Sequence, residues 1–291
     1  MAWAYVGETA ALTAAGLWAG ASVLYVRLGV SLPPLMLNFA KGLVAITLIG
    51  CTLLITGASW EIPTQSGGLL VLSGALGIGL GDTAFFSALN ALGARRTLLL
   101  ETSAPLLVAL LAWGMLGEIL APLAWSGILL TSLGIAWVIA ERTPGQEPLR
   151  LKQGLYWAFA AALCQAFGSL FSRAALTSSD ISPLLSTGVR LVAGNLAILP
   201  LLLWRRPTKL RISRRLGAGV AITAFGGTYL GIWLQQTALK FAPAGVAQTL
   251  LATSPLFVLP LAAITGEKVT VRALLGAVIA LLGTGLLFIA H

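Results

Sequence analysis

The chain has 291 residues, of which 58% are hydrophobic and only 9% are charged, and its mean hydropathy is +0.94. Ordinary soluble domains have about 25% charged residues, so this composition excludes a soluble globular protein. The net charge of +9 does not indicate a nucleic-acid partner, because most of the basic residues fall in short loops, where lipid headgroups account for them.

Long apolar segments follow one another along the whole chain, and each approaches the ~20 residues that a helix needs to cross a bilayer. Polar residues, prolines and glycines separate these segments, and the first one has no basic leader before it, so it is expected to be a retained span. The predicted spans, in chain order, are 7–29, 32–56, 66–91, 94–116, 120–140, 154–177, 181–204, 216–240, 243–265 and 269–290. The sequence therefore predicts an all-α membrane protein with ten transmembrane helices.

The longest polar connection, ERTPGQEPLRLKQ (141–153), lies at the middle of the chain. It divides the sequence into a first unit, 1–140, and a second unit, 154–291, each with five predicted spans. We interpret the connection as a cytoplasmic linker between the two units.

The distribution of Lys and Arg predicts the orientation in the membrane. One side receives RRPTKLRISRR (205–215) and most other basic loop residues, whereas the opposite side receives only Arg173 and Lys240. Because Lys and Arg accumulate on the cytoplasmic side, we expect the basic side to be cytoplasmic and both termini to face outward. The expected location is a bacterial-type inner membrane.

An internal repeat relates the two units. GDTAFFSAL (81–89) aligns with GIWLQQTAL (231–239), and Pro105 aligns with Pro255 at the same shift of 150 residues. Each unit has an odd number of spans, so the second must enter the membrane from the opposite side, which makes an inverted repeat. Inverted repeats are typical of secondary transporters, where they place the substrate near the midplane and support alternating access.

These features resemble the EamA-type carriers of the drug/metabolite transporter superfamily. The similarity rests on Trp18 in the first span, on a basic residue in the second and seventh spans (Lys41 and Arg190), and on an A-L…P-L…GE series in both units. The resemblance implies an exporter of amino acids or similar small metabolites. It implies no cofactor, and two fused repeats imply that a monomer would suffice.

Charged residues inside predicted spans are candidates for function, because a charge at the centre of a spanning helix costs about 2.5–3.5 kcal/mol. Lys41, Asp82 and Glu101 are expected in the inner half of the membrane. In one interpretation they form a buried ion-pair cluster, together with Arg95 or Arg96, that fixes helix packing or closes an inner gate. In the other, Glu101 or Asp82 carries a coupling proton or pairs with a substrate ammonium.

Arg190 is the fourth charge within a span. Its planar donors suit a substrate carboxylate or phosphate, and they equally suit backbone carbonyl groups at a helix end. Both interpretations stay open from the sequence.

Aromatic and polar residues at helical spacing predict the walls of a small-molecule cavity. In the eighth predicted span, Tyr229, Trp233 and Gln236 recur at i, i+4 and i+7, on one face of the helix. Gln235 and Gln248 are also expected to face the cavity. The alternative for the glutamines is that they form hydrogen bonds between helices. The predicted substrate-binding residues are Trp18, Ser22, Phe86, Gln165, Arg190, Tyr229, Trp233 and Gln236.

Two further features predict irregular helices. Gly77 and Gly81 form a G-x-x-x-G pattern, which indicates close helix packing or a bending point. Pro105 and Pro255 are expected to kink the fourth and ninth spans.

Other functional classes find little support in the sequence. It contains no G-x-x-x-x-G-K-[ST] loop for ATP, and its only histidine is His291, so neither a histidine metal site nor a Ser–His catalytic site is expected. We therefore do not expect an enzyme. A passive channel or a lipid-handling membrane protein is the alternative to a carrier.

Overall fold

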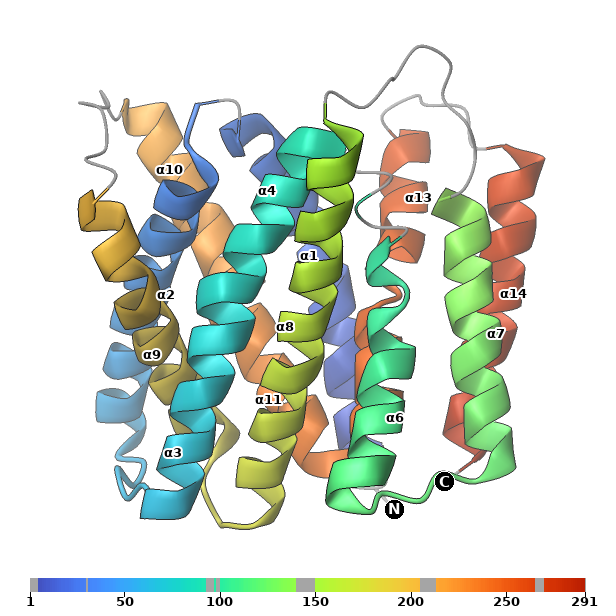
Figure 1. The fold of residues 1–291 in the computed structure, drawn as a ribbon, viewed down its shortest axis with the longest axis horizontal. Coiled ribbons are helices and arrows are strands. Elements are labelled where there is room, and N and C mark those ends of the chain that lie inside the picture. Colours follow the sequence, from blue (N-terminus) through green and yellow to red (C-terminus); the bar gives the residue numbers. More distant parts are fainter. Residues whose placement is uncertain are drawn as a thin grey trace.

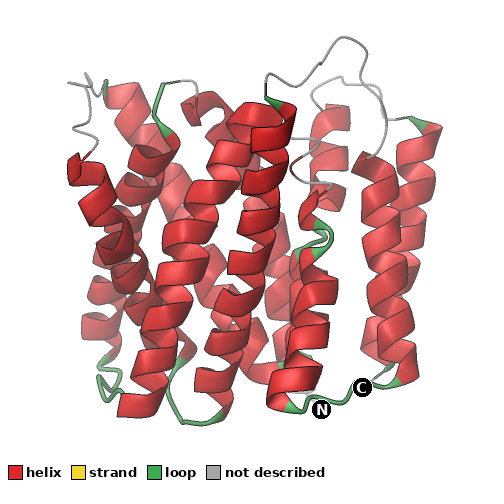
Figure 2. Cartoon of the chain, in the orientation of Figure 1, coloured by secondary structure: helices red, strands yellow, loops and turns green. Residues whose placement is uncertain are grey.

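The computed structural model describes residues 5–29, 31–92, 97, 100–139, 150–204, 213–264 and 270–290. Within these ranges the chain consists of helices joined by short turns, with no strand (Figure 2). The helices stand side by side as a bundle (Figure 1).

The helices of the first half are α1 (Val6–Gly29), α2 (Pro34–Thr56), α3 (Thr64–Ser73), η1 (Gly74–Gly81), α4 (Asp82–Leu92), α6 (Ala104–Leu116) and α7 (Pro122–Ile139). Those of the second half are α8 (Leu151–Thr177), α9 (Pro183–Trp204), α10 (Arg214–Thr223), η2 (Ala224–Leu230), α11 (Gly231–Phe241), α12 (Ala244–Leu251), α13 (Ser254–Ile264) and α14 (Val271–Ile289). The segments α3, η1 and α4 form one span, as do α10, η2 and α11.

The prediction of an all-α protein with ten spans is confirmed for the described chain. Seven of its helices are long and apolar enough to cross a membrane. Two shorter apolar segments, Ala104–Leu116 and Ala244–Pro260, and the 24-residue α1 supply the other three.

The two halves run in opposite directions. The helix α1 begins at the end of the bundle that carries both termini, whereas α8 begins at the opposite end (Figure 1). The rings of Tyr5 and Phe288 lie 5.6 Å apart, which brings the first and last described segments together. An odd number of spans per half produces this inversion, as the sequence predicts. Residues 141–149 of the predicted linker lie outside the described ranges, and 151–153 belong to α8.

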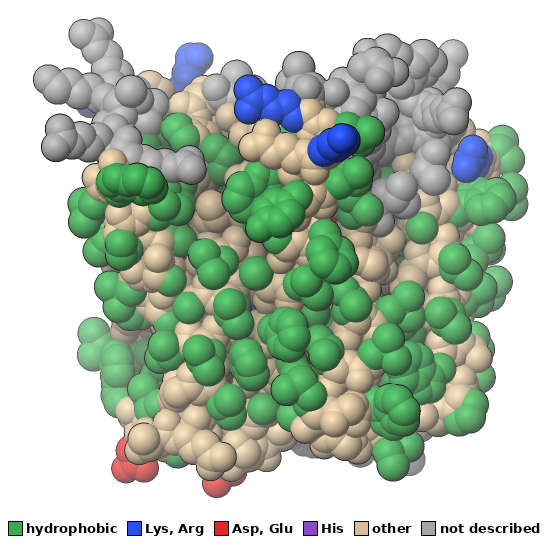
Figure 3. Space-filling model, viewed as in Figure 1, with side chains coloured by type: hydrophobic (Ala, Val, Ile, Leu, Met, Phe, Trp, Pro, Cys, Tyr) green, Lys and Arg blue, Asp and Glu red, His purple; other side chains and the backbone are tan. Residues whose placement is uncertain are grey.

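The surface of the bundle is polarised along its height. On the face that Figure 3 shows, hydrophobic side chains cover the middle, Lys and Arg lie at one end, and Asp and Glu lie at the other. We call the end with Lys and Arg the basic end; α8, α10 and α14 begin there, near Arg150, Arg214 and Arg272. We call the opposite end, where Tyr5 and Ala290 lie, the terminal end.

Two spans are interrupted at equivalent positions of the repeat. A turn at 102–103 precedes α6, and a turn at 252–253 separates α12 from α13. Pro105 and Pro255 each lie in the first turn of the helix that follows, where a proline costs nothing because its missing N–H has no partner in a helix anyway. The fourth and ninth spans are therefore broken helices rather than continuous rods.

The third and eighth spans each contain a π-helical segment, and these segments also match in the repeat. The segment η1 begins at Gly74 and η2 begins at Ala224, 150 residues later. Each packs against the other half, η1 on α8 and α9, and η2 on α1 and α2. A Cβ atom at Gly74 would overlap the backbone oxygen of Arg190, so only glycine permits this close crossing.

Candidate functional site

A cavity of about 270 Å³ is lined by both halves of the bundle. Its lining comes from α1, α2, η1, α4, α6 and α7 of the first half, and from α8, α9, η2, α11, α12 and α13 of the second. The helix α1 contributes Trp18, Ser22 and Tyr25, which belong to its second half and therefore lie toward the basic end. Arg190 and Gln248, by contrast, follow the starts of α9 and α12 at the terminal end, so the lining spans the middle of the bundle.

All four irregular backbone segments reach this cavity. The interrupted spans supply Thr102 and Pro105 on one side and Ala252 and Pro255 on the other, and both π-helical segments line it as well. In membrane proteins, non-helical backbone is tolerated where it lines a cavity, and π-helical bulges are frequent at functional sites. The two helix breaks and the two π-helical segments therefore all lie at the cavity.

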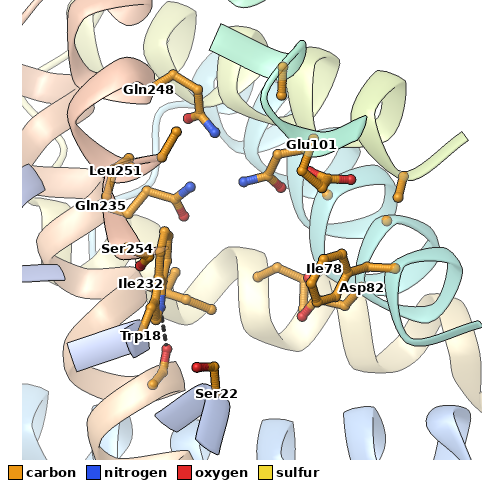
Figure 4. Close-up of a pocket in the computed structure, with 18 of the residues that line it drawn as sticks. Trp18, Ser22, Ile78, Asp82, Glu101, Ile232, Gln235, Gln248, Leu251 and Ser254 are labelled. Atoms are coloured by element: carbon orange, nitrogen blue, oxygen red, sulfur yellow. Dashed lines mark hydrogen bonds between the residues drawn. The ribbon is translucent and has the colours of Figure 1, made fainter. Parts of the chain in front are cut away.

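The side chain of Trp18 joins the two halves at the cavity wall. Its Nε1 donates a hydrogen bond of 2.7 Å to the carbonyl oxygen of Gly227 in η2. The hydroxyl of Ser22, on the next turn of α1, donates to the carbonyl oxygen of Ala19 at 2.8 Å. Both residues line the cavity, and Figure 4 shows them on adjacent turns below Ile232.

Lys41 and Asp82 form an ion pair at the cavity wall. The Nζ atom of Lys41 lies 2.6 Å from Oδ2 of Asp82, and the two side chains are 7% and 29% exposed. The same ammonium lies 5.2 Å from the ring centre of Phe86 and 5.7 Å from that of Tyr25, within the range of cation–π attraction. The predicted ion-pair cluster is therefore present for these two residues.

Glu101 lines the cavity from the last residue before the turn that interrupts the fourth span. Its Oε1 atom is buried and has no hydrogen-bond partner among the described residues. Arg95 and Arg96, which the ion-pair interpretation also considers, lie outside the described residues. A buried carboxylate oxygen without a donor is an uncommon and costly arrangement in a folded protein.

Arg190 is only 1% exposed and reaches the cavity from α9. Its Nη1 donates to Oε1 of Gln235 at 3.3 Å, while its Nε has no partner among the described residues. The Nε2 atom of Gln235 is likewise buried and without an acceptor there. Gly77 leaves room for the guanidinium, because a Cβ atom at that position would lie 3.2 Å from Nη2 of Arg190.

Glutamine side chains contribute much of the remaining polar lining. Gln165 from α8 and Gln248 from α12 both line the cavity, and the Oε1 atom of Gln248 accepts a hydrogen bond from Ser169 at 3.2 Å. Figure 4 shows Gln235 and Gln248 projecting from one wall, with Glu101 on the opposite wall. The cavity thus has polar groups on two facing sides.

Three residues of the predicted set, Tyr229, Trp233 and Gln236, lie outside the cavity lining. The hydroxyl of Tyr229 bonds to Thr52 at 2.8 Å, and its ring lies 6.0 Å from that of Trp233.

The amide of Gln236 is buried among helices. Its Oε1 accepts hydrogen bonds from the hydroxyl groups of Ser172 and Ser186, which tie α11 to α8 and α9. The face of the eighth span that meets the cavity carries Ile232 and Gln235 instead. A 3.6-residue period is not maintained across a π-helical segment, so it cannot be extended from η2 into α11.

Several lining residues were not singled out from the sequence. Tyr25 lies seven residues after Trp18, and the spacing of Trp18, Ser22 and Tyr25 is the i, i+4, i+7 pattern that would have found it. Thr102 lies in the first helix break, and Ser254 directly follows the second. In the sequence, only the nearby prolines indicate that these two residues face the cavity.

A second polar cluster lies at the terminal end of the bundle, where α6 and α8 end (Figure 1). The Nε atom of Arg173 lies 2.5 Å from Oε1 of Glu118, and its Nη1 donates to the carbonyl oxygens of Leu239 and Lys240 at 2.7 and 2.9 Å. The other carboxylate oxygen of Glu118 accepts from the backbone N–H of Ala244 at 2.8 Å. We call these residues the terminal clamp. It ties the connection after α6 to α8, α11 and α12 of the other half.

Comparison with known proteins places these features in a wider context. The sequence matches the EamA-like transporter family over residues 5–140 and again over 152–289, so both halves match the same family. One solved crystal structure aligns with a TM-score of 0.80 over 96% of this chain and 95% of that chain, at 19% sequence identity, and so shares its fold. No curated protein matches the chain.

Proposed function

As a member of the EamA-like transporter family the chain is a membrane transporter, and we propose that it exports amino acids or similar small metabolites by alternating access. The observation that carries the proposal is the cavity between the two inverted halves, which two broken helices and two π-helical segments line. Secondary transporters bind their substrates between inverted repeats at such interrupted helices.

The terminal clamp supports the alternating-access part of the proposal. The cavity lies in the middle of the bundle, and the clamp of Glu118 and Arg173 holds the two halves together at the terminal end. In this arrangement the clamp is the gate that must open before the cavity can reach the terminal side. By the distribution of Lys and Arg, the basic end faces the cytoplasm and both termini face outward.

The residues proposed to hold the substrate are those that face the cavity, namely Trp18, Ser22, Phe86, Gln165 and Arg190. Tyr229 and Gln236 are proposed to support this wall from behind, because they bond to neighbouring helices, and Trp233 is proposed to do so through its ring contact with Tyr229. Lys41 and Asp82 are proposed as gate residues that hold the second span against the third.

Glu101 is the proposed coupling residue. The titratable or charged groups that share its cavity are Tyr25 on α1, Lys41 on α2, Asp82 on α4 and Arg190 on α9. Lys41 and Asp82 already neutralise each other, whereas Oε1 of Glu101 has no hydrogen-bond partner in the described part of the chain. This carboxylate is therefore free to exchange a proton for a cationic group of the substrate, which would make export an antiport with protons.

The test is solute exchange by the purified chain in proteoliposomes, with a panel of labelled amino acids at two pH values. We expect the parent to exchange at least one of them with a rate that depends on pH, and Glu101→Gln to lose this pH dependence. Glu61→Gln is the matched control, since Glu61 is exposed at the surface. If no amino acid is exchanged, the substrate class is wrong. If Glu101→Gln keeps the pH response of the parent, Glu101 is not the coupling residue.

A further inference from the structure

The indole N–H of Trp18 takes the place of a backbone donor in η2. The N–H of Gly231, the first residue after η2, bonds to the carbonyl oxygens of Gly226 and Thr228. In an α-helix this N–H would bond to the oxygen of Gly227, four residues earlier. That oxygen instead accepts from Nε1 of Trp18 at 2.7 Å (Figure 4). The π-helical turn and the side chain from α1 therefore depend on each other.

The same replacement occurs in η1, with a donor from a different part of the fold. The N–H of Asp82, the first residue after η1, bonds to the oxygen of Gly77, five residues earlier. The oxygen of Ile78 accepts from Nδ2 of Asn38 at 2.8 Å instead. Asn38 is buried on α2, in the same half as η1, whereas Trp18 and η2 belong to different halves. Of these two bonds, the one at η2 alone crosses between the halves.

Glycines let α1 approach η2 closely enough for this bond. A Cβ atom at Gly231 would overlap Nε1 of Trp18, and a Cβ atom at Gly227 would lie 2.9 Å from Cβ of Ala21. A Cβ atom at Gly226, in the same segment, meets no described atom within 4 Å. The bond from Trp18 therefore requires a residue without a side chain at 231 in particular.

The register of η2 decides where the two glutamines of α11 point. A π-helical segment accommodates one residue more than an α-helix does, so its loss turns the following helix by about 100° relative to the preceding one. Gln235 now accepts from Nη1 of Arg190 at 3.3 Å. Gln236 accepts from Ser172 and Ser186. After such a turn Gln235 occupies the place of Gln236, so the serines keep an amide acceptor while Arg190 loses its own.

From these contacts we infer that Trp18 is a positioning residue, whose indole N–H fixes the register of η2 and thereby the hold of Gln235 on Arg190. Because the bond joins the two halves, it breaks when they separate around Trp18; η2 then becomes α-helical and Arg190 is released into the cavity. Trp18 lines the cavity, so a solute there acts directly on this bond. The inference rests on the proposed alternating access only for the movement that breaks the bond, and it names no substrate.

Cross-linking reports the register directly. In a chain whose two native cysteines are replaced by serine, Ser186→Cys is combined with either Gln235→Cys or Gln236→Cys and treated in detergent with a short bifunctional thiol reagent. With Trp18 present, we expect the pair that includes position 236 to react preferentially. Trp18→Phe keeps an aromatic ring without the N–H, and it should shift the product ratio roughly 5- to 150-fold toward position 235, because a buried oxygen without a donor costs that much. An unchanged ratio would overturn the inference.

Gly231→Ala repeats the test from the other side of the bond, because its methyl group displaces Nε1 of Trp18. We expect the same shift as for Trp18→Phe, and no further shift when the two changes are combined. Gly226→Ala adds a methyl group to open space in the same segment, and Trp60→Phe changes an exposed tryptophan, so both controls should keep the parent ratio. Additive shifts, or a shift in either control as large as that of Gly231→Ala, would contradict the inference.

Exchange in proteoliposomes separates this inference from the proposed function. If the cross-linking shifts as expected but the parent exchanges no amino acid, the control of register by Trp18 stands and the proposed substrate class fails. If the parent exchanges amino acids and Trp18→Phe leaves the cross-linking unchanged, the proposed function stands and the inference is wrong.

Discussion

The ammonium of Lys41 lies 2.6 Å from Oδ2 of Asp82, and the two residues come from α2 and from the start of α4. The pair satisfies two charges that would each be costly inside a membrane bundle. It also leaves Glu101 and Arg190, which face the same cavity, available for a ligand. Lys41 and Asp82 are therefore paired with each other, whereas Glu101 and Arg190 have no ionic partner in the described part of the chain.

The ion pair of Lys41 and Asp82 predicts non-additive effects of neutralisation. Lys41→Gln or Asp82→Asn alone should lower stability by about 1–3 kcal/mol, because each leaves its partner without a counter-charge in a site largely closed to water. The double variant should lose less than the sum of the two, since removing both members of a buried pair is often nearly neutral. Thermal unfolding of the three variants in detergent is the measurement. Strictly additive losses would show that the two side chains do not depend on each other.

The close crossing of η1 and α9 predicts a packing defect. Gly74→Ala places a methyl group on the backbone of Arg190, which must move, and overpacking of this kind costs about 1–3 kcal/mol. Because Arg190 lines the cavity and must shift, exchange of amino acids in proteoliposomes should slow as well. Gly50→Ala is the control, since a Cβ atom at Gly50 meets nothing within 4 Å. Equal thermal stability of the two variants would mean that the crossing is not as tight as the structure indicates.

The terminal clamp predicts a change in access to the cavity. Glu118→Gln removes the charge that holds Arg173, and the loss of roughly 1–3 kcal/mol should favour opening of the terminal end about 5- to 150-fold. The measurement uses a chain in which Cys51 and Cys164 are replaced by serine and Ser254 by cysteine. The rate at which a membrane-impermeant thiol reagent labels the cysteine at position 254 is then measured. We expect faster labelling from the terminal side in the Glu118 variant. Unchanged labelling would show that the clamp is not a gate.

The polarised surface predicts the topology. A reporter that is active only in the cytoplasm should be inactive when fused after His291, because the C-terminal helix ends at the end of the bundle opposite the basic one. The same reporter inserted within 205–212, next to the basic start of α10, should be active. The reverse pattern would place the termini in the cytoplasm.

Much of the fold follows from the sequence for one physical reason. Hydrocarbon requires long apolar helices with internally satisfied backbones, so composition and punctuation are enough to find ten spans. The opposite direction of the halves follows from the odd number of spans in each. The π-helical form of η1 and η2 does not follow, because it depends on contacts with the other half, such as that between Gly74 and Arg190.

The sequence predicts the candidate site mainly through the charged residues that lie within its spans. Lys41, Asp82, Glu101 and Arg190 all line the cavity, since a charge within a span has few other places to lie. Uncharged polar residues carry a weaker signal, because a glutamine such as Gln236 that bonds serines on neighbouring helices looks the same in sequence as one that faces a ligand.

Counterflow in proteoliposomes tests the central claim, transport by alternating access, most directly. Vesicles that contain the purified chain are loaded with excess unlabelled leucine and diluted into a trace of labelled leucine. A carrier couples outward and inward movement, so we expect the label to rise transiently above its external concentration and to saturate with the internal leucine. A monotonic approach to equilibrium without this overshoot would contradict the account and indicate a passive channel.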